Sequence, residues 1–319
     1  MRRLCVLVGA LVLMPLVPGT AHAYDRVAYA TPTTMVESPK GSEGSVRATL
    51  ALGTVAAGTS HNLRSEVVVG DGRNDGALSR VAVGHKITCQ AVGGTTLAGG
   101  QIWSGQNLLE NQQNVKLAVR MVFTPATTGN YQCLLRVYLN DGLASGRETA
   151  KLVSGFIADI DGPIAPVVQT FGANSNTHFA LDAPGKQLHP VTYQPLPGAT
   201  SFLATTDVYV TSCYGTGGNA CGPGSYPASG TARVRFRTVA TPSSTAPGCV
   251  AQASPSTTTP VSNRVHHLRI LGQLTVAQPA GGCGTWRVNA FAEDNGGTLP
   301  FVIHGTPYGV TYVRPPVQS

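Results

Sequence analysis

Cysteine is the residue type in this chain whose number and spacing indicate the most definite chemistry. Seven cysteines occur, and the first, Cys5, lies in an amino-terminal apolar segment. The other six are spread over both halves of the chain: Cys89, Cys133, Cys213, Cys221, Cys249 and Cys283. An even number of cysteines in an exported chain is typical of a disulfide framework, here of three bridges. No C-x2-C pair occurs, so the spacing does not favour zinc, and we expect no metal or other cofactor.

The amino terminus has the three parts of a cleavable secretory signal. Arg2 and Arg3 form a positive flank, Leu4 to Val17 is almost wholly apolar, and Ala21 and Ala23 place small residues at −3 and −1. These features predict a signal peptide over residues 1–23, cleaved after Ala23, and a secreted product that folds in an oxidising compartment. The run is too short to span a bilayer with ease, and no later run approaches about 20 apolar residues, so we expect no membrane span.

Motifs for catalysis are absent from the sequence. There is no G-x-S-x-G elbow, H-E-x-x-H helix or glycine-rich phosphate loop. His266 and His267 are adjacent, and neighbours on a strand point to opposite faces, so we expect a surface pair rather than a metal site. Asp159 and Asp161 are interpreted as solvated linker acids, with a calcium site as the alternative. The sequence therefore favours a protein that is not an enzyme.

Arginines at every second position mark a possible basic patch. Arg233, Arg235 and Arg237 alternate with Val234 and Phe236, which places all three on one face of a predicted strand. We expect that face to meet water or an acidic partner, because like charges two residues apart repel. Two further arginines on other predicted strands, Arg269 and Arg287, are counted with the patch. Long Lys/Arg runs are absent, which excludes nucleic acid as a partner.

Period-two alternation of apolar and polar residues dominates the chain and predicts an all-β fold. It is clearest over residues 115–123, 131–139, 233–237 and 286–290. Turn signals such as Asn-Asp-Gly separate such runs, and the chain holds 38 Gly and 22 Pro. No stretch keeps a helical period for three turns. Only 12% of residues are charged, which fits an extracellular β protein.

The length of 319 residues suggests two domains after the signal peptide. Residues 24–44 show no clear period and are predicted to be a flexible lead-in. The best boundary is at residues 158–163, where a strand-like run meets Gly-Pro, so we expect β-sandwiches over residues 45–158 and 163–319. Two segments of low complexity, 215–230 and 241–263, are predicted to be exposed, mobile loops.

The residues Cys89, Trp103, Tyr131 and Cys133 form a pattern that resembles the immunoglobulin-like β-sandwich. The resemblance covers about 45 residues and departs from the family at Thr127, where an acid is usual. It implies that Cys89 and Cys133 join the two sheets and that Trp103 packs on the bridge in the core. It also implies that Tyr131, two residues before the second cysteine, hydrogen-bonds backbone through its hydroxyl.

The second half carries no such pattern and is predicted to be a second sandwich with two disulfides. Cys213 and Cys221 flank a Gly-rich turn, which favours a local bridge and leaves Cys249 to pair with Cys283. Two other pairings of these four cysteines remain open. Trp286 alternates with polar neighbours and is expected in the core.

Together these features predict a secreted, non-enzymatic binding or structural protein that recognises an unknown extracellular protein or glycan through sandwich loops or edges. One alternative is a carbohydrate-binding module, which needs exposed aromatics on a flat face; the candidates are Tyr209, Tyr214, Tyr226, Tyr308 and Tyr312. Another is a secreted hydrolase, which predicts a polar pocket between the domains where His, Asp and Ser converge. The sequence does not indicate the partner or the oligomeric state.

Overall fold

A computed structural model describes residues 25–36, 43–72, 81–109, 111–141, 149–164, 168–171, 176–218, 220–305 and 307–315. All regular structure in these ranges is β-strand, so the predicted all-β class is confirmed. No helix that could cross a membrane occurs among the described residues. The predicted signal peptide, residues 1–23, lies outside them.

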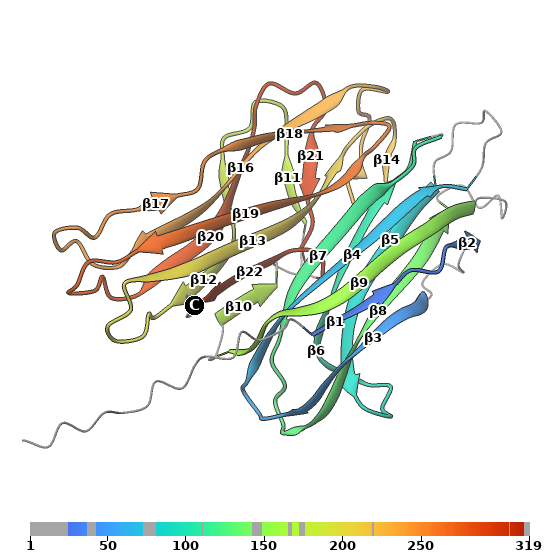
Figure 1. The fold of residues 1–319 in the computed structure, drawn as a ribbon. Coiled ribbons are helices and arrows are strands. Elements are labelled where there is room, and N and C mark those ends of the chain that lie inside the picture. Colours follow the sequence, from blue (N-terminus) through green and yellow to red (C-terminus); the bar gives the residue numbers. More distant parts are fainter. Residues whose placement is uncertain are drawn as a thin grey trace, which may run out of the picture.

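The first part of the chain forms two antiparallel sheets around one core (Figure 1). One sheet has the order β1-β9-β4-β7, with β2 also on β9, and its strands are β1 (Asp25–Tyr29), β2 (Thr33–Val36), β4 (Ser60–Asp71), β7 (Val115–Phe123) and β9 (Thr149–Ile164). The other has the order β3-β8-β5-β6 and consists of β3 (Ser45–Val55), β5 (Val81–Ala91), β6 (Leu97–Asn107) and β8 (Gly129–Asp141). Alternate residues of both sheets, such as Leu63, Val67, Ile87 and Leu135, fill the space between them.

The second part forms a sandwich of the same kind (Figure 1). Its first sheet has the order β10-β22-β13-β21-β11, with β19 on the free side of β13: β10 (Val168–Phe171), β11 (Thr177–Phe179), β13 (Ser201–Ser212), β19 (His267–Ala277), β21 (Phe301–Ile303) and β22 (Val310–Arg314). Its second sheet has the order β12-β20-β16-β17, with β18 also on β16: β12 (Lys186–Tyr193), β16 (Thr231–Pro242), β17 (Gln252–Ala253), β18 (Thr257–Ser262) and β20 (Trp286–Asp294). A small separate hairpin joins β14 (Gly217–Gly218) to β15 (Gly222–Pro223).

Strand pairing is nested in both sandwiches. In the first, β1 pairs with β9, β3 with β8, β4 with β7 and β5 with β6, all antiparallel. In the second, β10 pairs with β22, β12 with β20, β13 with β19 and β16 with β18. Such nesting describes one long antiparallel ribbon folded over into two sheets, which is the jelly-roll arrangement. The chain therefore repeats one topology twice, although its sequence shows no internal repeat.

The predicted immunoglobulin-like bridge between sheets is wrong. Cys89 and Cys133 do form a disulfide, but they lie directly opposite each other on the neighbouring strands β5 and β8, with Cα atoms 4.1 Å apart. Both are fully buried in the core. Alternation correctly placed both cysteines on the inner face, but it does not reveal which sheet each strand joins. Trp103 also departs from the pattern, because it is only half-buried and its ring contacts Tyr138 and Tyr308.

The two other disulfides are those favoured from the sequence. Cys213 bridges to Cys221 over 8 residues, beside the β14–β15 hairpin, and Cys249 bridges to Cys283 over 34 residues. All six cysteines after residue 23 are therefore paired. Trp286 is fully buried, where its ring packs against Phe202.

Three predictions about the organisation of the chain change. The flexible lead-in is wrong over residues 25–36, because β1 and β2 both pair with β9. The expected boundary at residues 158–163 lies inside β9, which continues to Ile164. The low-complexity segments contain short strands: β14 and β15 in one, β17 and β18 in the other. Backbone hydrogen bonds form these edge pairings, so side-chain periodicity signals them weakly.

Tyr131 makes the contact that the resemblance implied, although the surrounding topology differs. Its ring is buried and packs edge-on against Phe123, while its hydroxyl donates to the Thr127 carbonyl at 2.8 Å. We expect Tyr131→Phe to lower the free energy of unfolding by about 0.5–1.5 kcal/mol, because a part-buried hydrogen bond to the Thr127 carbonyl is lost. Urea denaturation would measure this. An unchanged unfolding midpoint would show that water replaces the hydroxyl at no cost.

Candidate functional site

The two sandwiches meet along a continuous surface, called the seam below, where β6 and β7 face β13, β19 and β22. Val310 and Tyr312 of the second sandwich belong to the buried core of the first. The Trp103 amide donates to the Pro307 carbonyl at 3.2 Å, and the Gln169 side chain donates to the Val122 carbonyl at 2.8 Å. Apolar packing and hydrogen bonds to backbone thus fix how the two sandwiches sit together.

A buried ion pair lies at the centre of the seam. Arg269 of β19 donates through Nε to Asp207 Oδ1 of β13 at 2.8 Å, and the side chains are only 8% and 4% exposed. Arg269 Nη1 also donates to the Trp103 carbonyl of the first sandwich at 2.6 Å. Burial raises the pKa of Asp207, and the Arg269 guanidinium opposes that shift. One guanidinium therefore links both sandwiches.

Histidine and tyrosine rings surround this ion pair. Tyr209 stacks on His267 and on Tyr308, with centroids 5.5 Å apart in both cases. The Thr211 hydroxyl lies 2.7 Å from His267 Nδ1 and 2.6 Å from His304 Nε2. It has one proton, so it can donate to one ring while accepting from the other. Burial lowers the pKa of His304 to about 4, which keeps that ring neutral at pH 7.

His85 and Lys86 place two further buried ionisable groups on strand β5, His85 on its inner face and Lys86 on its outer face. The His85 ring is fully buried, neither ring nitrogen has a hydrogen-bond partner among the described residues, and burial lowers its pKa to about 3. Lys86 is also fully buried; its ammonium lies 4.2 Å from the Trp103 ring centroid and forms an ion pair with Glu43. Lys86 thus contacts the indole of a residue whose backbone bonds the second sandwich.

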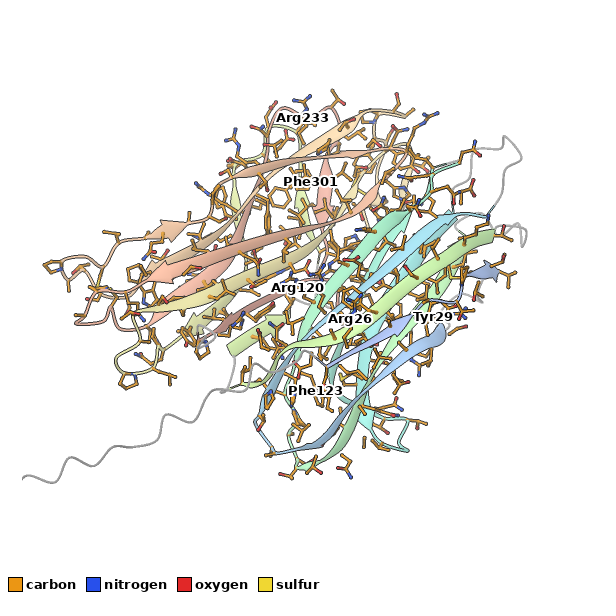
Figure 2. All side chains as sticks on the ribbon, in the orientation of Figure 1. Arg26, Tyr29, Arg120, Phe123, Arg233 and Phe301 are labelled. Carbon is orange, nitrogen blue, oxygen red and sulfur yellow. A yellow bond between two sulfur atoms is a disulfide. The ribbon has the colours of Figure 1, made fainter. Side chains whose placement is uncertain are left out.

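A cleft of about 220 Å³ opens at the seam beside the buried ion pair. Its walls come from β6 and β7 of the first sandwich, with Arg64 of β4, and from β13 and β19 of the second. Four cationic side chains and one acid line it: Arg64, Lys116, Arg120, Arg269 and Asp207. Figure 2 shows Arg120 between the two sandwiches. The expected convergence of His, Asp and Ser is not found there, because no histidine lines this cleft.

The two acids at the predicted boundary are paired rather than solvated. Asp159 accepts from His61 Nδ1 at 2.7 Å, and Asp161 accepts from Asn62 at 2.6 Å and pairs with Arg314 at 3.2 Å. Each carboxylate has a donor or cationic partner, and no group of three acids, His or Cys among the described residues could hold a metal ion here, so the alternative of a calcium site is not supported. Ser60 stands beside His61 in sequence, but its hydroxyl bonds Thr124 at 2.9 Å.

The predicted basic patch lies on the outward face of β16, and Figure 2 shows Arg233 on the side of the second sandwich away from the first. Arg233 and Arg235 are exposed and Arg237 is half-buried. Arg235 pairs with Glu293 of β20 at 2.9 Å, while the Arg237 guanidinium lies 4.6 Å from the Phe291 ring centroid.

Arg287 is exposed on the same face, on strand β20. Arg269 was wrongly counted with this patch, since β19 belongs to the opposite sheet and its side chain is buried at the seam.

The aromatic candidates for a sugar platform are covered. Tyr209 and Tyr312 are buried, and Tyr214, Tyr226 and Tyr308 are half-buried. The large exposed hydrophobic side chains of the described residues are all Val or Leu. The structure therefore offers no flat aromatic face in the part of the chain that it describes.

His266 and His267 depart from the expected surface pair. Their ring centroids lie 4.0 Å apart, and both residues are half-buried. His266 precedes the first residue of β19, so strand alternation does not separate the two rings. Among the described residues, no three His, Cys, Asp or Glu side chains are grouped so that they could hold a metal ion.

The seam residues were missed by sequence reasoning, although one signal was present. Asp207 stands in the middle of an otherwise uncharged run, residues 201–212, and such an acid in a strand core needs a partner. The partner, Arg269, is 62 residues away and could not be identified from spacing.

Comparison with protein-family profiles and with curated proteins returns no match. Among solved structures, the tandem CBM22-1-CBM22-2 domain of Paenibacillus barcinonensis Xyn10C shares 10% identity over 91% of this chain and 93% of that chain, with a TM-score of 0.22. Broad Bean Stain Virus shares 7% identity over 90% and 89%, with a TM-score of 0.30. Infectious bursal disease virus Gx strain shares 10% identity over 90% and 74%, with a TM-score of 0.22. Such low scores carry no functional argument.

Proposed function

We propose that this chain is an exported, non-enzymatic binding protein whose second sandwich docks on a polyanionic extracellular ligand, glycan or protein, through the outward face of β16 and β20. The observation that carries the proposal is the row of Arg233, Arg235 and Arg237 along that face. Export rests on the amino-terminal signal and fits the three disulfides.

The charge balance of the face supports an anionic ligand. Two acids stand on these strands. Glu293 pairs with Arg235, and Asp294 accepts the backbone amides of Asp182 and Gly297. Arg233 and Arg287 add positive charge that this pairing does not cancel. Arg237 is held against Phe291, which presets one guanidinium in a fixed position and reduces the entropy lost on binding.

The two alternatives receive less support from the geometry. A carbohydrate module of the aromatic-platform kind needs exposed rings, and the candidate tyrosines are buried or half-buried. A hydrolase needs a nucleophile, a base and an acid in contact. His61 has its acid in Asp159, while Ser60 bonds Thr124 instead, and Thr211 bonds two histidines.

The test is binding of the secreted chain to immobilised heparin, polygalacturonate and polyglutamate at rising salt. We expect retention that salt weakens, because exposed charges are screened. The triple variant R233Q/R235Q/R237Q should bind at least about tenfold more weakly, from three contacts of about 0.5–1 kcal/mol each at exposed or half-buried side chains.

A matched variant distinguishes binding by this arginine face from attraction by the net charge of the chain. R26Q/R47Q/K151Q also removes three cations, all from the first sandwich. Equal loss of binding in the two triple variants would show that general charge attracts the ligand and would refute the proposed face. No retention of the unmodified chain on any of the three polymers would refute the proposal as a whole.

A further inference from the structure

The cleft at the seam has the composition of a site for a small anion. It is smaller than the roughly 300–1,000 Å³ pockets that hold drug-sized molecules, so it suits a single functional group. Of its lining residues, Leu117 and Val119 belong to the core of the first sandwich and Leu268 packs against the core of the second, so apolar cores flank the cleft and reduce the dielectric screening of its charges.

The positive charge of the cleft exceeds its negative charge. Asp207 is the one acid among the residues that line it, and Asp207 already accepts from Arg269. Arg64 is balanced by Glu66 at 2.8 Å, outside the lining. Arg120 also interacts with Asp207, so Arg120 and Arg269 share the one acid of the lining, and Lys116 has no acidic counterpart there.

A buried guanidinium atom next to the cleft also lacks a partner. Arg269 uses Nε for Asp207 and Nη1 for the Trp103 carbonyl, but Nη2 is buried with no hydrogen-bond partner among the described residues. An unsatisfied buried donor on a charged group costs free energy unless a ligand or water completes it. Arg120 also bonds the Tyr312 side chain, which holds its guanidinium at the cleft.

The geometry points to an oxyanion site in this cleft: we infer that a carboxylate, sulfate or phosphate group of a ligand binds between Lys116, Arg120 and Arg269. Planar guanidinium groups match such oxyanions with paired hydrogen bonds, and the lysine adds a point charge at the rim. The site draws on both sandwiches, so its occupant also bridges the seam. This inference does not depend on the arginine face of β16.

The experiment is calorimetric titration of the full secreted chain with sodium sulfate, at constant ionic strength maintained with sodium chloride. We expect saturable binding of one sulfate. K116Q should weaken it severalfold and R120Q about tenfold or more, as for loss of a hydrogen bond to a charged group. Two-dimensional NMR should show a shift of the Ser104 backbone amide, because its peptide unit contains the Trp103 carbonyl that Arg269 bonds.

The control is R233Q/R237Q, which removes two cations from the far face of the second sandwich and should leave sulfate affinity unchanged. Lys116 is exposed on β7, so K116Q decides the question if R120Q fails to fold. Absence of saturable binding would overturn the inference. The inference would also be overturned if R233Q/R237Q lowered the sulfate affinity while K116Q left it unchanged, because the anion would then bind the outer face.

Discussion

Acidification from pH 8 to pH 5 should destabilise this protein by several kcal/mol. Burial, with a contribution from Arg269, lowers the pKa of His85 to about 3 and the pKa values of His189 and His304 to about 4. In the unfolded chain these rings titrate near pH 6.5. Below that pH the unfolded state binds more protons than the folded state, so stability is present at neutral pH and is lost as pH falls toward 4.

The size of the destabilisation follows from the difference between the pH of the measurement and the pKa of histidine in the unfolded chain. At pH 5 each of these three buried rings costs about 2 kcal/mol, together on the order of 6 kcal/mol, a large share of a typical folding free energy. His267, whose pKa is also lowered by burial, adds to this loss. Urea denaturation of the chain from pH 8 to pH 4 would measure the slope.

A single substitution tests the origin of that slope. His85→Leu should remove about 2 kcal/mol of the loss at pH 5, because leucine does not titrate. The substitution breaks no hydrogen bond among the described residues, since neither ring nitrogen has a partner there. Ile87→Val, two residues along the same inner face, should cost about 0.5–1.5 kcal/mol equally at every pH. Parallel stability curves for His85→Leu and the unmodified chain would assign the acid sensitivity to other groups.

Local patterns predicted the strands but not their assembly. Alternation over residues 115–123 and 131–139 matches β7 and β8, because one face of each packs against the opposite sheet. Cys213 and Cys221 were paired correctly because a short loop leaves little choice. The nested pairing of β1 with β9 joins strands more than 100 residues apart, and no local signal specifies it.

The immunoglobulin-like pattern gave a wrong topology because it, too, is a local pattern and does not specify which strands pair. Cys89, Trp103, Tyr131 and Cys133 fix which residues share a face, and Tyr131 does make its expected bond. They do not fix whether two strands lie side by side or in opposite sheets, because period-two alternation is the same in both. The pattern was therefore informative about side-chain direction and silent about topology.

The seam lay beyond sequence reasoning because a second sandwich covers a polar face. Arg269 alternates with Leu268 and Ile270, as a surface residue of an ordinary strand would. In the folded chain the apolar face of β19 meets its partner sheet, and the polar face meets the first sandwich. Alternation reports that one face is apolar; it cannot report that the other face is also buried.

Substitution of Asp207 by Asn should be the most damaging single change at the seam. It leaves the Arg269 guanidinium buried without its carboxylate, and breaking a buried pair in this way costs about 3–5 kcal/mol. Glu293→Gln breaks the partly exposed pair with Arg235 and should cost less than about 1 kcal/mol. Urea denaturation of the two variants would compare these losses directly.

The double variant D207L/R269M separates the loss of pairing from the loss of packing. It removes both charges, so most of the stability lost in Asp207→Asn should return, because no unpaired ion remains buried. It also removes the bond from Arg269 to the Trp103 carbonyl, the link between the sandwiches. Unfolding of the double variant should therefore split into two transitions, one for each sandwich, if this guanidinium couples them. A single transition at the original midpoint would show that the apolar contacts of Val310 and Tyr312 suffice to join the two halves.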